Sequence, residues 1–430
     1  MLTKQDNALL CETGAGTAMG ELFRRYWVPA MTSAELPEPD GAPVRMKLLG
    51  EQLIAFRDTN GAVGLVANAC PHRGASMFFG RNEDAGLRCV YHGWKFDIEG
   101  TCTDMPNEPA ESNFKHKIHL AAYPAVERGG VVWAYMGPEG ERPPLPELEW
   151  ITVPDEQRYV SRRLEECNWA QAMEGGIDSS HISFLHRDRR PPTDGQARQF
   201  SRGTQYVTAD RSPRFEVAGT DYGLLIGARR NAEPGHYYWR ITQWLAPWYT
   251  MIPPFGDAPI GGHAWVPADD ETCWTWSFDW HPTRVLNEDE LANYRTGGGI
   301  HLELVPGTFK PASNRENDYR IDRTLQKSGY SYTGIRGIGA QDNAMQESMG
   351  VVYDRSREHL GSSDTAIIAA RRFLMRAAAA LQGHGATPPG LDTAAQRVRS
   401  VSIVLPDSVS WPEGAKAALT ATPGTYVIAV

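Results

Sequence analysis

Residues 70–94 read Cys-Pro-His-Arg-Gly-Ala-Ser-Met-Phe-Phe-Gly-Arg-Asn-Glu-Asp-Ala-Gly-Leu-Arg-Cys-Val-Tyr-His-Gly-Trp. This stretch holds two short Cys/His pairs, Cys70-x-His72 and Cys89-x2-His92, with sixteen residues between them. Each pair brings one thiolate and one imidazole to the tip of a tight loop, and both groups bind transition metals. The spacing therefore predicts a metal site that is built from two loops.

The ligand set fits two kinds of metal centre. Zinc accepts two Cys and two His in a tetrahedral site, whereas a Rieske [2Fe–2S] cluster places two thiolates on one iron and two imidazoles on the other. Close pairs in structural zinc sites are more often both Cys or both His, but each pair here is mixed. The neighbours Pro71, Arg73-Gly74 and Tyr91-His92-Gly93-Trp94 also resemble the Rieske loops. We therefore expect a [2Fe–2S] cluster with four ligands, namely Cys70, His72, Cys89 and His92.

Composition narrows the class of protein. A chain of 430 residues fits two or three domains of ordinary size. It has no apolar run near the roughly eighteen residues of a membrane helix, and its first residues lack the features of a signal peptide. We therefore expect a cytoplasmic protein that does not bind membranes. The formal net charge of −9 comes without a long basic run, which argues against nucleic-acid binding. The four cysteines outside the cluster pairs are expected to be reduced thiols.

The order of periodic segments predicts three regions. Residues 1–30 carry a helical pattern that we expect to stop at Pro29. Residues 31–150 contain short strand-like runs with turn signals, which predict a small antiparallel β domain that carries the cluster loops. Residues 151–430 combine a multi-stranded antiparallel sheet with helices, and the polar residues 186–205 are expected to form a surface loop or lid.

Individual elements are also expected from these patterns. The expected strands are Val44–Leu49, Gln52–Arg57, Val63–Ala67, Gly130–Met136, Tyr222–Arg229, Tyr237–Trp244, Tyr249–Ile252, Gly262–Val266 and Cys273–Trp280. The expected helices are Glu288–Arg295, Asp342–Asp354 and Ser363–Leu381, the last of which we expect to be capped by Ser363 and ended by Gly383.

A second metal site is indicated by Asp178-Ser-Ser-His-Ile-Ser-Phe-Leu-His186. A spacing of three residues puts Asp178 and His181 on one face of a helix. The spacing from His181 to His186 is five residues, which on an ideal helix separates their side chains by roughly 140°. Both histidines therefore reach one metal only where the helix distorts or ends near Ser183. The alternative is that His181 and His186 are ordinary helix residues, one buried and one exposed, that bind no metal. A Rieske cluster, however, delivers single electrons and needs an acceptor, and two His with one carboxylate form the triad of non-haem Fe(II) oxygenases.

The carboxylate of that triad must come from elsewhere in the chain. Asp342 is the best candidate, because it follows a glycine-rich turn and is expected to start a helix that aims one carboxylate inward. Glu347 and Asp354 are the alternatives. The expected iron ligands are therefore His181, His186 and Asp342.

With these motifs the chain resembles the catalytic subunit of the Rieske non-haem iron oxygenases. It is most similar to the phthalate dioxygenase group, with which it shares Asn-Trp-x-Gln at Asn168, the dipeptide Gln341-Asp342 and the segment 354–361. The resemblance implies an α+β fold, in which a small antiparallel β Rieske domain is inserted in a larger domain of helices over an antiparallel sheet. Residues 1–30 would pack on that catalytic domain.

The resemblance also implies a reaction. A separate reductase, with flavin and a ferredoxin-type cluster, would pass NADH electrons to the Rieske cluster and on to mononuclear Fe(II), with O2 as co-substrate. The chain itself has no Gly-rich nucleotide fingerprint or plant-type ferredoxin cysteine set. We expect hydroxylation or dihydroxylation of an aromatic carboxylate of the phthalate or benzoate type. The alternatives are an aryl-ether O-demethylase and, from another class, a zinc- or cluster-containing electron-transfer or binding protein without catalytic iron.

Three arginines are candidates for binding an acidic substrate. Arg229, Arg230 and Arg240 lie on strand-like runs, and arginine holds a carboxylate in a bidentate pair. Side chains alternate along a strand, so Arg229 and Arg230 face opposite ways and at most one of them enters a pocket. The alternative is that these arginines are solvated.

Asp178 has a further expected role. It lies close enough to hydrogen-bond the nitrogen of His181 that does not bind iron, and its second oxygen remains free. In the family that the chain resembles, that oxygen meets a Rieske histidine of the neighbouring subunit. The resemblance thus implies a bridge from Asp178 to His72 or His92 of an adjacent protomer, in a homo-oligomer that is a trimer or stacked trimers.

Overall fold

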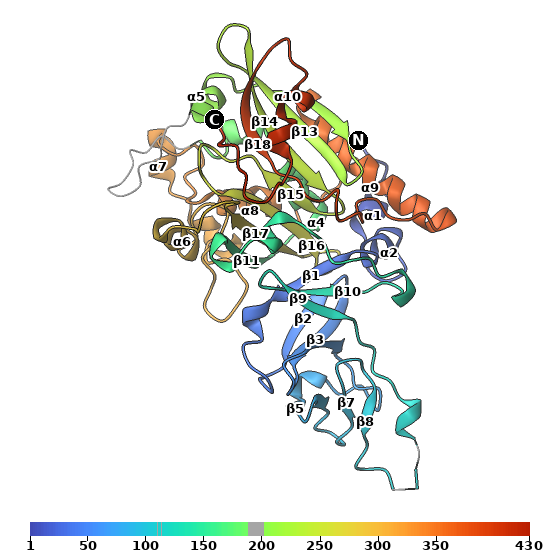
Figure 1. Ribbon diagram of the computed structural model, residues 1–430. Helices are drawn as coiled ribbons and strands as arrows, with labels where there is room; N and C mark the ends of the chain where they lie inside the picture. Colours follow the sequence, from blue (N-terminus) through green and yellow to red (C-terminus); the bar gives the residue numbers. More distant parts are fainter. Residues whose placement is uncertain (110, 113, 188–201) are drawn as a thin grey trace.

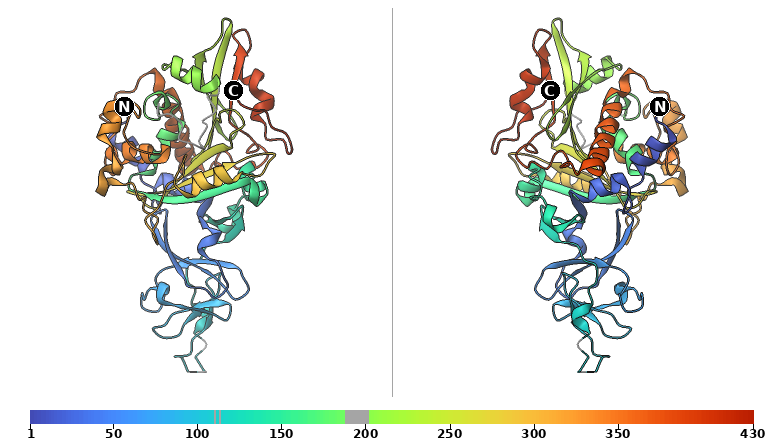
Figure 2. Two further views of the ribbon diagram at one scale, coloured as in Figure 1. Left: turned by 90° about the vertical axis from the view of Figure 1, so that its left-hand side faces the viewer. Right: turned by 90° about the vertical axis from the view of Figure 1, so that its right-hand side faces the viewer.

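The computed structural model describes residues 1–430 with the exception of residues 110, 113 and 188–201. The chain forms two lobes along the long axis of the molecule (Figure 1). The narrow lobe contains the cluster loops, and the broad lobe contains both termini, as Figure 2 shows from two sides. No helix within the described part of the chain has the length and apolar character needed to cross a membrane.

Three small antiparallel sheets build the narrow lobe and its junction with the broad lobe. The junction sheet has the order β1-β10-β9, and the other two have the orders β2-β3-β4 and β5-β6-β7-β8. The strands are β1 Trp27–Thr32, β2 Val44–Leu48, β3 Glu51–Arg57, β4 Val63–Ala67, β5 Arg81–Glu83, β6 Gly86–Arg88, β7 Lys95–Phe96, β8 Cys102–Asp104, β9 Ala125–Arg128 and β10 Val131–Tyr135. The narrow lobe has a hydrophobic cluster of its own, which includes Phe56, Trp94 and the two cluster cysteines, Cys70 and Cys89.

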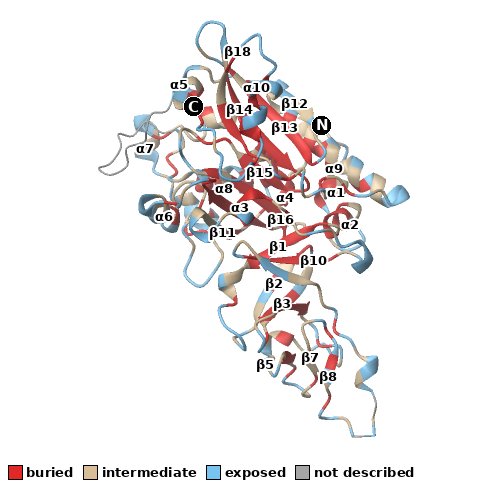
Figure 3. Ribbon diagram, viewed as in Figure 1, coloured by how far each residue is buried: buried red, intermediate tan, exposed pale blue. Residues whose placement is uncertain are grey.

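The broad lobe is organised around an eight-stranded antiparallel sheet of order β11-β17-β16-β15-β14-β13-β12. Its strands are β11 Arg158–Glu165, β12 Arg214–Gly219, β13 Gly223–Asn231, β14 His236–Leu245, β15 Tyr249–Ile252, β16 Ile260–Pro267 and β17 Cys273–Trp280, and β18 Val401–Pro406 pairs with β14. Two strands pair with different parts of the same edge of β14. Residues 243–245 of β14 pair with β15, and residues 236–241 pair with β18. Every residue of β17 is buried, so the sheet is covered on both faces at this strand, whereas β12 at the edge is partly exposed (Figure 3).

Helices cover this sheet and connect it to the N-terminus. They are α1 Lys4–Cys11, α2 Ala18–Arg24, α3 Glu149–Thr152, α4 Trp169–Ile177, α5 Arg202–Ala209, α6 Glu288–Arg295, α7 Arg323–Ser328, α8 Ile338–Ser348, α9 Thr365–His384 and α10 Trp411–Leu419. Short 3-10 helices lie at Ser33–Glu35, Met77–Phe79, Lys115–Lys117, Glu139–Glu141, Asp155–Gln157, His181–Ser183, Arg315–Arg320 and Ser362–Asp364. Helix α4 packs on β15 and β16, α8 packs on α4, and α1 and α2 pack against α9. This observed arrangement of helices over an antiparallel sheet, with a small β lobe, confirms the expected fold class.

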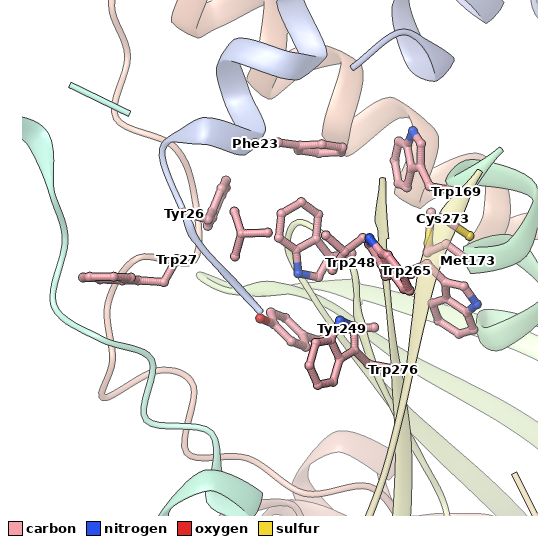
Figure 4. Close-up of a cluster of buried hydrophobic side chains, with 14 of the residues drawn as sticks. Phe23, Tyr26, Trp27, Trp169, Met173, Trp248, Tyr249, Trp265, Cys273 and Trp276 are labelled. Atoms are coloured by element: carbon pink, nitrogen blue, oxygen red, sulfur yellow. The ribbon is translucent and has the colours of Figure 1, made fainter. Parts of the chain in front are cut away.

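An aromatic cluster fixes the start of α4 (Figure 4). Phe23 of α2 makes edge contacts with Trp169 and with Trp248, each with ring centroids 4.9 Å apart. Asn168 caps the helix through Ala170 N–H, and its amide donates to the carbonyls of Cys11 and Asp270 at 3.0 and 2.7 Å. A fully buried side chain with all these bonds leaves α4 little freedom, so the segment that follows the helix starts from a fixed point.

Several expected elements are confirmed and others are wrong. The bounds of β4, β15, β17 and α6 agree with the expected ones. The expected helix does not run to Pro29, since α2 ends at Arg24. Pro29 instead lies in β1, next to an irregularity in the pairing of β1 with β10. Strand β1 is buried on both sides, and a continuous apolar run has the same appearance in a buried strand and in a helix.

Differences also occur later in the chain. Helix α8 begins at Ile338, four residues before the expected start at Asp342. Helix α9 is preceded by Asp364 rather than Ser363, and it is ended by Gly385, in the left-handed conformation, rather than by Gly383. Of the expected loop 186–205, residues 188–201 lie outside the described residues and residues 202–205 belong to helix α5. Strands β12 and β18 and helix α10 were not expected. The proposed domain limits at residues 30 and 150 stay a prediction.

Candidate metal centres

The two Cys/His loops of the narrow lobe have the same backbone structure. Cys70 N–H donates to Ala75 O at 2.9 Å, and Gly74 N–H donates back to Cys70 O at 2.8 Å. The second loop repeats this pattern, with Cys89 N–H to Trp94 O at 2.8 Å and Gly93 N–H to Cys89 O at 2.9 Å. Gly74 and Gly93 have φ angles of +75° and +80°, a conformation that glycine adopts without strain. Each loop thus presents one thiol and one imidazole.

Within these loops the cysteines lie inside and the histidines lie toward the tip. Cys70 and Cys89 are buried, and the rings of His72 and His92 meet with centroids 4.4 Å apart. Nδ1 of His92 is buried and has no hydrogen-bond partner within the described part of the chain, as expected for a nitrogen that binds a metal. Burial raises the pKa of the Cys70 thiol to about 11, so a positive metal ion is needed to hold it as a thiolate at neutral pH.

The arrangement of the four Cys and His residues favours a two-iron cluster over a single zinc ion. A tetrahedral zinc site needs its ligand atoms within roughly 4 Å of one another. Among the described residues, just one group of three or more metal-binding side chains has its ligand atoms within 4.8 Å of one another, and that group is not in the narrow lobe. The four Cys and His residues therefore fit a centre with two metals better than a single ion.

The group that meets this criterion is His181, His186 and Asp342. The Nε2 atoms of the two histidines are 2.9 Å apart, and Oδ1 of Asp342 lies 3.3 Å from Nε2 of His186 and 3.7 Å from Nε2 of His181. Two imidazole nitrogens and one carboxylate oxygen thus face one point, as expected from the sequence. The alternatives lie elsewhere, because Glu347 accepts from Glu166 N–H and Asp354 accepts from Ser356.

The local structure that brings these ligands together differs from the expected one. Helix α4 ends at Ile177, Asp178 has extended backbone angles, and a short 3-10 helix begins at His181. Asp178 and His181 therefore do not share a helix face, and the early end of α4 lets His181 and His186 reach the same point. Asp342 does not start α8 but is its fifth residue, one turn inside the helix.

Two glycines of α4 let this helix approach its neighbours closely. A methyl group added at Gly176 would overlap the Trp265 ring of β16, and one added at Gly175 would overlap the Gln346 amide of α8. Both contacts fix α4 relative to the sheet and to the helix that carries Asp342.

We expect Gly176→Ala to destabilise the protein by roughly 1–3 kcal/mol, because the core must shift to admit the methyl group. Gly383→Ala is the matched control, since no atom lies near an added methyl group on that exposed turn of α9. Denaturant unfolding of both variants measures the effect, and equal stabilities would contradict the proposed packing constraint.

Hydrogen bonds orient both histidines. Nδ1 of His181 lies 3.3 Å from Asp178 Oδ2, and Nδ1 of His186 lies 2.8 Å from Gln341 Oε1. Burial works to raise the pKa of Asp342, but the charge and hydrogen bond of His186 outweigh it and leave that pKa below its usual value. Burial likewise opposes ionisation of Asp178, and its contacts with His181 lower its pKa. The contact between Gln341 and His186 was not predicted from the sequence.

The three candidate arginines do not lie together. Arg229 packs over the ring of Tyr237 at 4.2 Å on one face of the sheet, and Arg230 belongs to the other face, as strand alternation predicted. Arg240 pairs with Ala228 and therefore shares the face of Arg230, which was not predicted. Arg230 Nη2 donates to Ser179 O at 2.8 Å, which places this side chain next to Asp178. Arg230 and Arg240 are buried and, within the described residues, neither forms an ion pair. Each also keeps a buried nitrogen that has no hydrogen-bond partner among the described residues, Nη1 in Arg230 and Nε in Arg240.

Comparison with known proteins identifies the family. Residues 26–124 match the family model of the Rieske [2Fe-2S] domain, and residues 134–422 match the LigXa C-terminal domain like family. The chain belongs to the family of Rieske oxygenase catalytic subunits. It is therefore the oxygenase component of a Rieske non-haem iron oxygenase.

Curated relatives cover almost the whole chain. The oxygenase subunit of 3-chlorobenzoate-3,4-dioxygenase from Comamonas testosteroni is 40% identical, with 96% of this chain and 97% of the relative covered. The oxygenase subunit of phthalate 4,5-dioxygenase from Pseudomonas putida is 38% identical, with 96% and 94% covered. The oxygenase subunit of 5,5'-dehydrodivanillate O-demethylase from Sphingobium sp. is 31% identical, with 87% and 80% covered. A binding protein without catalytic iron gains no support from these relatives.

Solved structures share the fold at low identity. Dicamba monooxygenase bound to dicamba is 18% identical with a TM-score of 0.58, and the alignment covers 84% of this chain and 98% of that one. A carbazole-bound oxygenase and ferredoxin complex of carbazole 1,9a-dioxygenase is 20% identical with a TM-score of 0.57, with 84% and 91% covered. These likenesses extend over both lobes.

Proposed function

We propose that this chain is the terminal oxygenase of a system that uses O2 to hydroxylate or dihydroxylate an aromatic carboxylate. The proposed cluster ligands are Cys70, His72, Cys89 and His92, and the proposed Fe(II) ligands are His181, His186 and Asp342. When bound, the cluster supplies electrons one at a time and Fe(II) supplies open coordination positions for O2.

The observation that carries this proposal is the convergence of three ligand atoms on one point. Both histidines turn Nε2 toward Asp342, and their Nδ1 atoms are held by Asp178 and Gln341. Such outer hydrogen bonds are what a metal site needs to fix its imidazole ligands. Three protein ligands on one side also leave room for substrate and O2 on the other.

The substrate class is proposed from Arg230 and Arg240. A buried guanidinium without a counterion is costly, and a carboxylate that accepts its free N–H groups would relieve this cost. Burial and the nearby charge of Arg240 lower the pKa of Arg230 to about 10, which still leaves Arg230 protonated at neutral pH. The relatives named for 3-chlorobenzoate and phthalate are consistent with an acidic aromatic substrate.

Substitution of either buried arginine is expected to weaken substrate binding selectively. Loss of a charged hydrogen bond of about 1.5–3 kcal/mol predicts a KM for phthalate or benzoate that is roughly 10–150-fold higher in Arg230→Met and Arg240→Met. Arg229→Met is the matched control on the opposite face, for which we expect less than about threefold change. Steady-state kinetics of variants with full cluster and iron content measure this, and equal effects at all three positions would contradict the assignment.

An aryl-ether O-demethylase is the second candidate, because one relative of 31% identity is named as an O-demethylase. The same site would then hold the methyl group of a methoxybenzoate near iron. Formaldehyde release from methoxybenzoates distinguishes this reaction from ring hydroxylation.

Electrons are proposed to come from a separate reductase that oxidises NADH and carries flavin and a ferredoxin-type cluster. A carbazole dioxygenase oxygenase has been solved in complex with ferredoxin, and this chain has the same fold. Because NADH is an intracellular reductant, we also propose a cytoplasmic location.

We propose a homotrimer, alone or stacked in pairs, as the functional assembly. The cluster loops lie in the narrow lobe, and α4 and α8 lie in the broad lobe (Figure 1). Large apolar side chains are exposed in both places, among them Val90 and Tyr91 beside His92, and Met345 and Met349 on or next to α8. Heterologous contacts that pair the tip of one chain with the broad lobe of the next would cover both patches and close a ring.

In that ring Asp178 is proposed to link His181 to His72 or His92 of the adjacent protomer. Asp178→Asn is expected to keep both metals and the oligomer but to lower kcat roughly 100-fold, because the amide offers a donor where an acceptor is needed. Stopped-flow oxidation of the reduced cluster measures the transfer step. A fully active monomer in sedimentation experiments, or an unchanged oxidation rate in Asp178→Asn, would exclude this role.

A further inference from the structure

Gln341 makes two hydrogen bonds that together fix its side chain. This buried residue of α8 accepts from His186 Nδ1 through Oε1 at 2.8 Å, and its Nε2 donates to Ile335 O at 2.9 Å. A backbone carbonyl is only an acceptor, so the amide nitrogen must face Ile335 and the amide oxygen must face His186. The orientation of the amide is therefore set by Ile335 and not by the histidine.

This orientation has a consequence for His186. An acceptor at Nδ1 requires a proton on that nitrogen, and a neutral imidazole carries one N–H, so Nε2 keeps its lone pair. That Nε2 atom lies 2.9 Å from Nε2 of His181 and 3.3 Å from Oδ1 of Asp342. Gln341 thus selects the tautomer that directs a free lone pair to the point shared by the three candidate ligands.

The segment that holds Gln341 also contacts the residues on both sides of His186. Ile335 belongs to residues 330–337, which lie between α7 and α8. In the same segment, Tyr332 N–H donates to Arg187 O at 3.1 Å, and the Tyr332 ring packs edge-on against Phe184 with centroids 6.2 Å apart. The residues on both sides of His186 are thus held by the segment that also holds Gln341.

We propose that Gln341 is a positioning residue that holds His186 in the tautomer and orientation required to bind Fe(II). The proposal rests on the proposed iron site and adds a residue to it. It also makes the two histidines unequal, because His181 is held by the carboxylate of Asp178 and His186 by a neutral amide.

The test measures Fe(II) affinity of the full chain with its cluster intact. Gln341→Leu is expected to bind Fe(II) 10–100-fold more weakly, the usual cost of losing a hydrogen bond to a metal-bound histidine. The electron paramagnetic resonance signal of its Fe(II)–nitric oxide adduct should broaden, because the ring of His186 is no longer fixed. Gln341→Glu keeps an acceptor for Nδ1–H and is expected to restore the affinity to within about fivefold of wild type.

Two controls make the result decisive. Gln396→Leu removes another buried amide, one that donates to Gly390 O and accepts from Glu147 N–H outside α4 and α8, and should leave Fe(II) affinity unchanged even where stability falls. His186→Ala should lose Fe(II) binding, and if it binds like wild type the proposed iron site is wrong rather than the role of Gln341. Wild-type affinity and an unchanged signal in Gln341→Leu, with His186→Ala defective, would overturn the inference.

Discussion

His186→Ala, His181→Ala and Asp342→Ala are each expected to lose most of their mononuclear iron and to lower turnover about a thousandfold or more. A site with three protein ligands has no spare ligand, and loss of one leaves too few groups to hold Fe(II). The ligand atoms of these three residues lie within 4.8 Å of one another. Iron analysis combined with O2 uptake measures the effect.

The cluster is expected to be intact in these variants, because the narrow lobe has a separate hydrophobic core. Visible absorbance per chain should therefore equal that of wild type. His384→Ala, at the exposed end of α9, is a suitable control for histidine loss. Full iron occupancy and activity in Asp342→Ala would mean that another carboxylate is the ligand.

Loss of a cluster ligand is expected to remove the cluster and to leave the mononuclear iron in place, which is the opposite of the result for the iron ligands. His72→Ala and Cys89→Ser should abolish the red-brown colour and the visible spectrum, since each removes one of two ligands of an iron atom, while Fe(II) at the second site remains. Electron delivery then fails, so NADH-coupled turnover should be undetectable. Absorbance spectra and iron content per chain measure both centres.

Cys102→Ser is the matched control for the cluster variants. Cys102 is also buried in the narrow lobe, but its thiol lies 3.6 Å from the Asp104 carbonyl and it belongs to neither loop. We expect its spectrum to be unchanged. A His72→Ala protein that keeps the wild-type spectrum would exclude the Rieske assignment, and a zinc protein would be colourless.

The sequence named candidate ligands for both metal centres, because the Cys/His pairs and the two histidines after α4 stand at short spacings in loops. The structure brings His181, His186 and Asp342 together, and the assignment of all these residues as metal ligands stays a prediction. Asp342 was also found, although the reason was partly wrong, since α8 begins at Ile338 and not at Asp342. The end of α4 before Asp178 could not be predicted, because no local pattern shows that Asp178 leaves the helix and that its carboxylate accepts from Ser180 N–H and His181 N–H. Helix propensity is too weak to locate such an end.

Contacts between distant segments were the part of the site that was hardest to predict from the sequence. Gln341 meets His186 only because the segment around Ile335 and helix α8 fold over the residues after α4, and no local pattern encodes this approach. Strand alternation did predict that Arg229 and Arg230 face opposite ways. It could not predict that Arg230 and Arg240 each keep a buried nitrogen without a hydrogen-bond partner in the described part of the chain, which is the observation that favours an acidic substrate.

The most direct test of the proposed function is a single turnover with isotopically labelled oxygen. The oxygenase, with both centres loaded and its cluster reduced, is mixed with 18O2 and one member of a panel of phthalates, benzoates and methoxybenzoates. We predict that, with at least one acidic aromatic present, O2 oxidises the cluster rapidly and the aromatic product contains 18O, and that His186→Ala yields no such product. Absence of 18O from every product, or equal product formation by His186→Ala, would contradict the proposal.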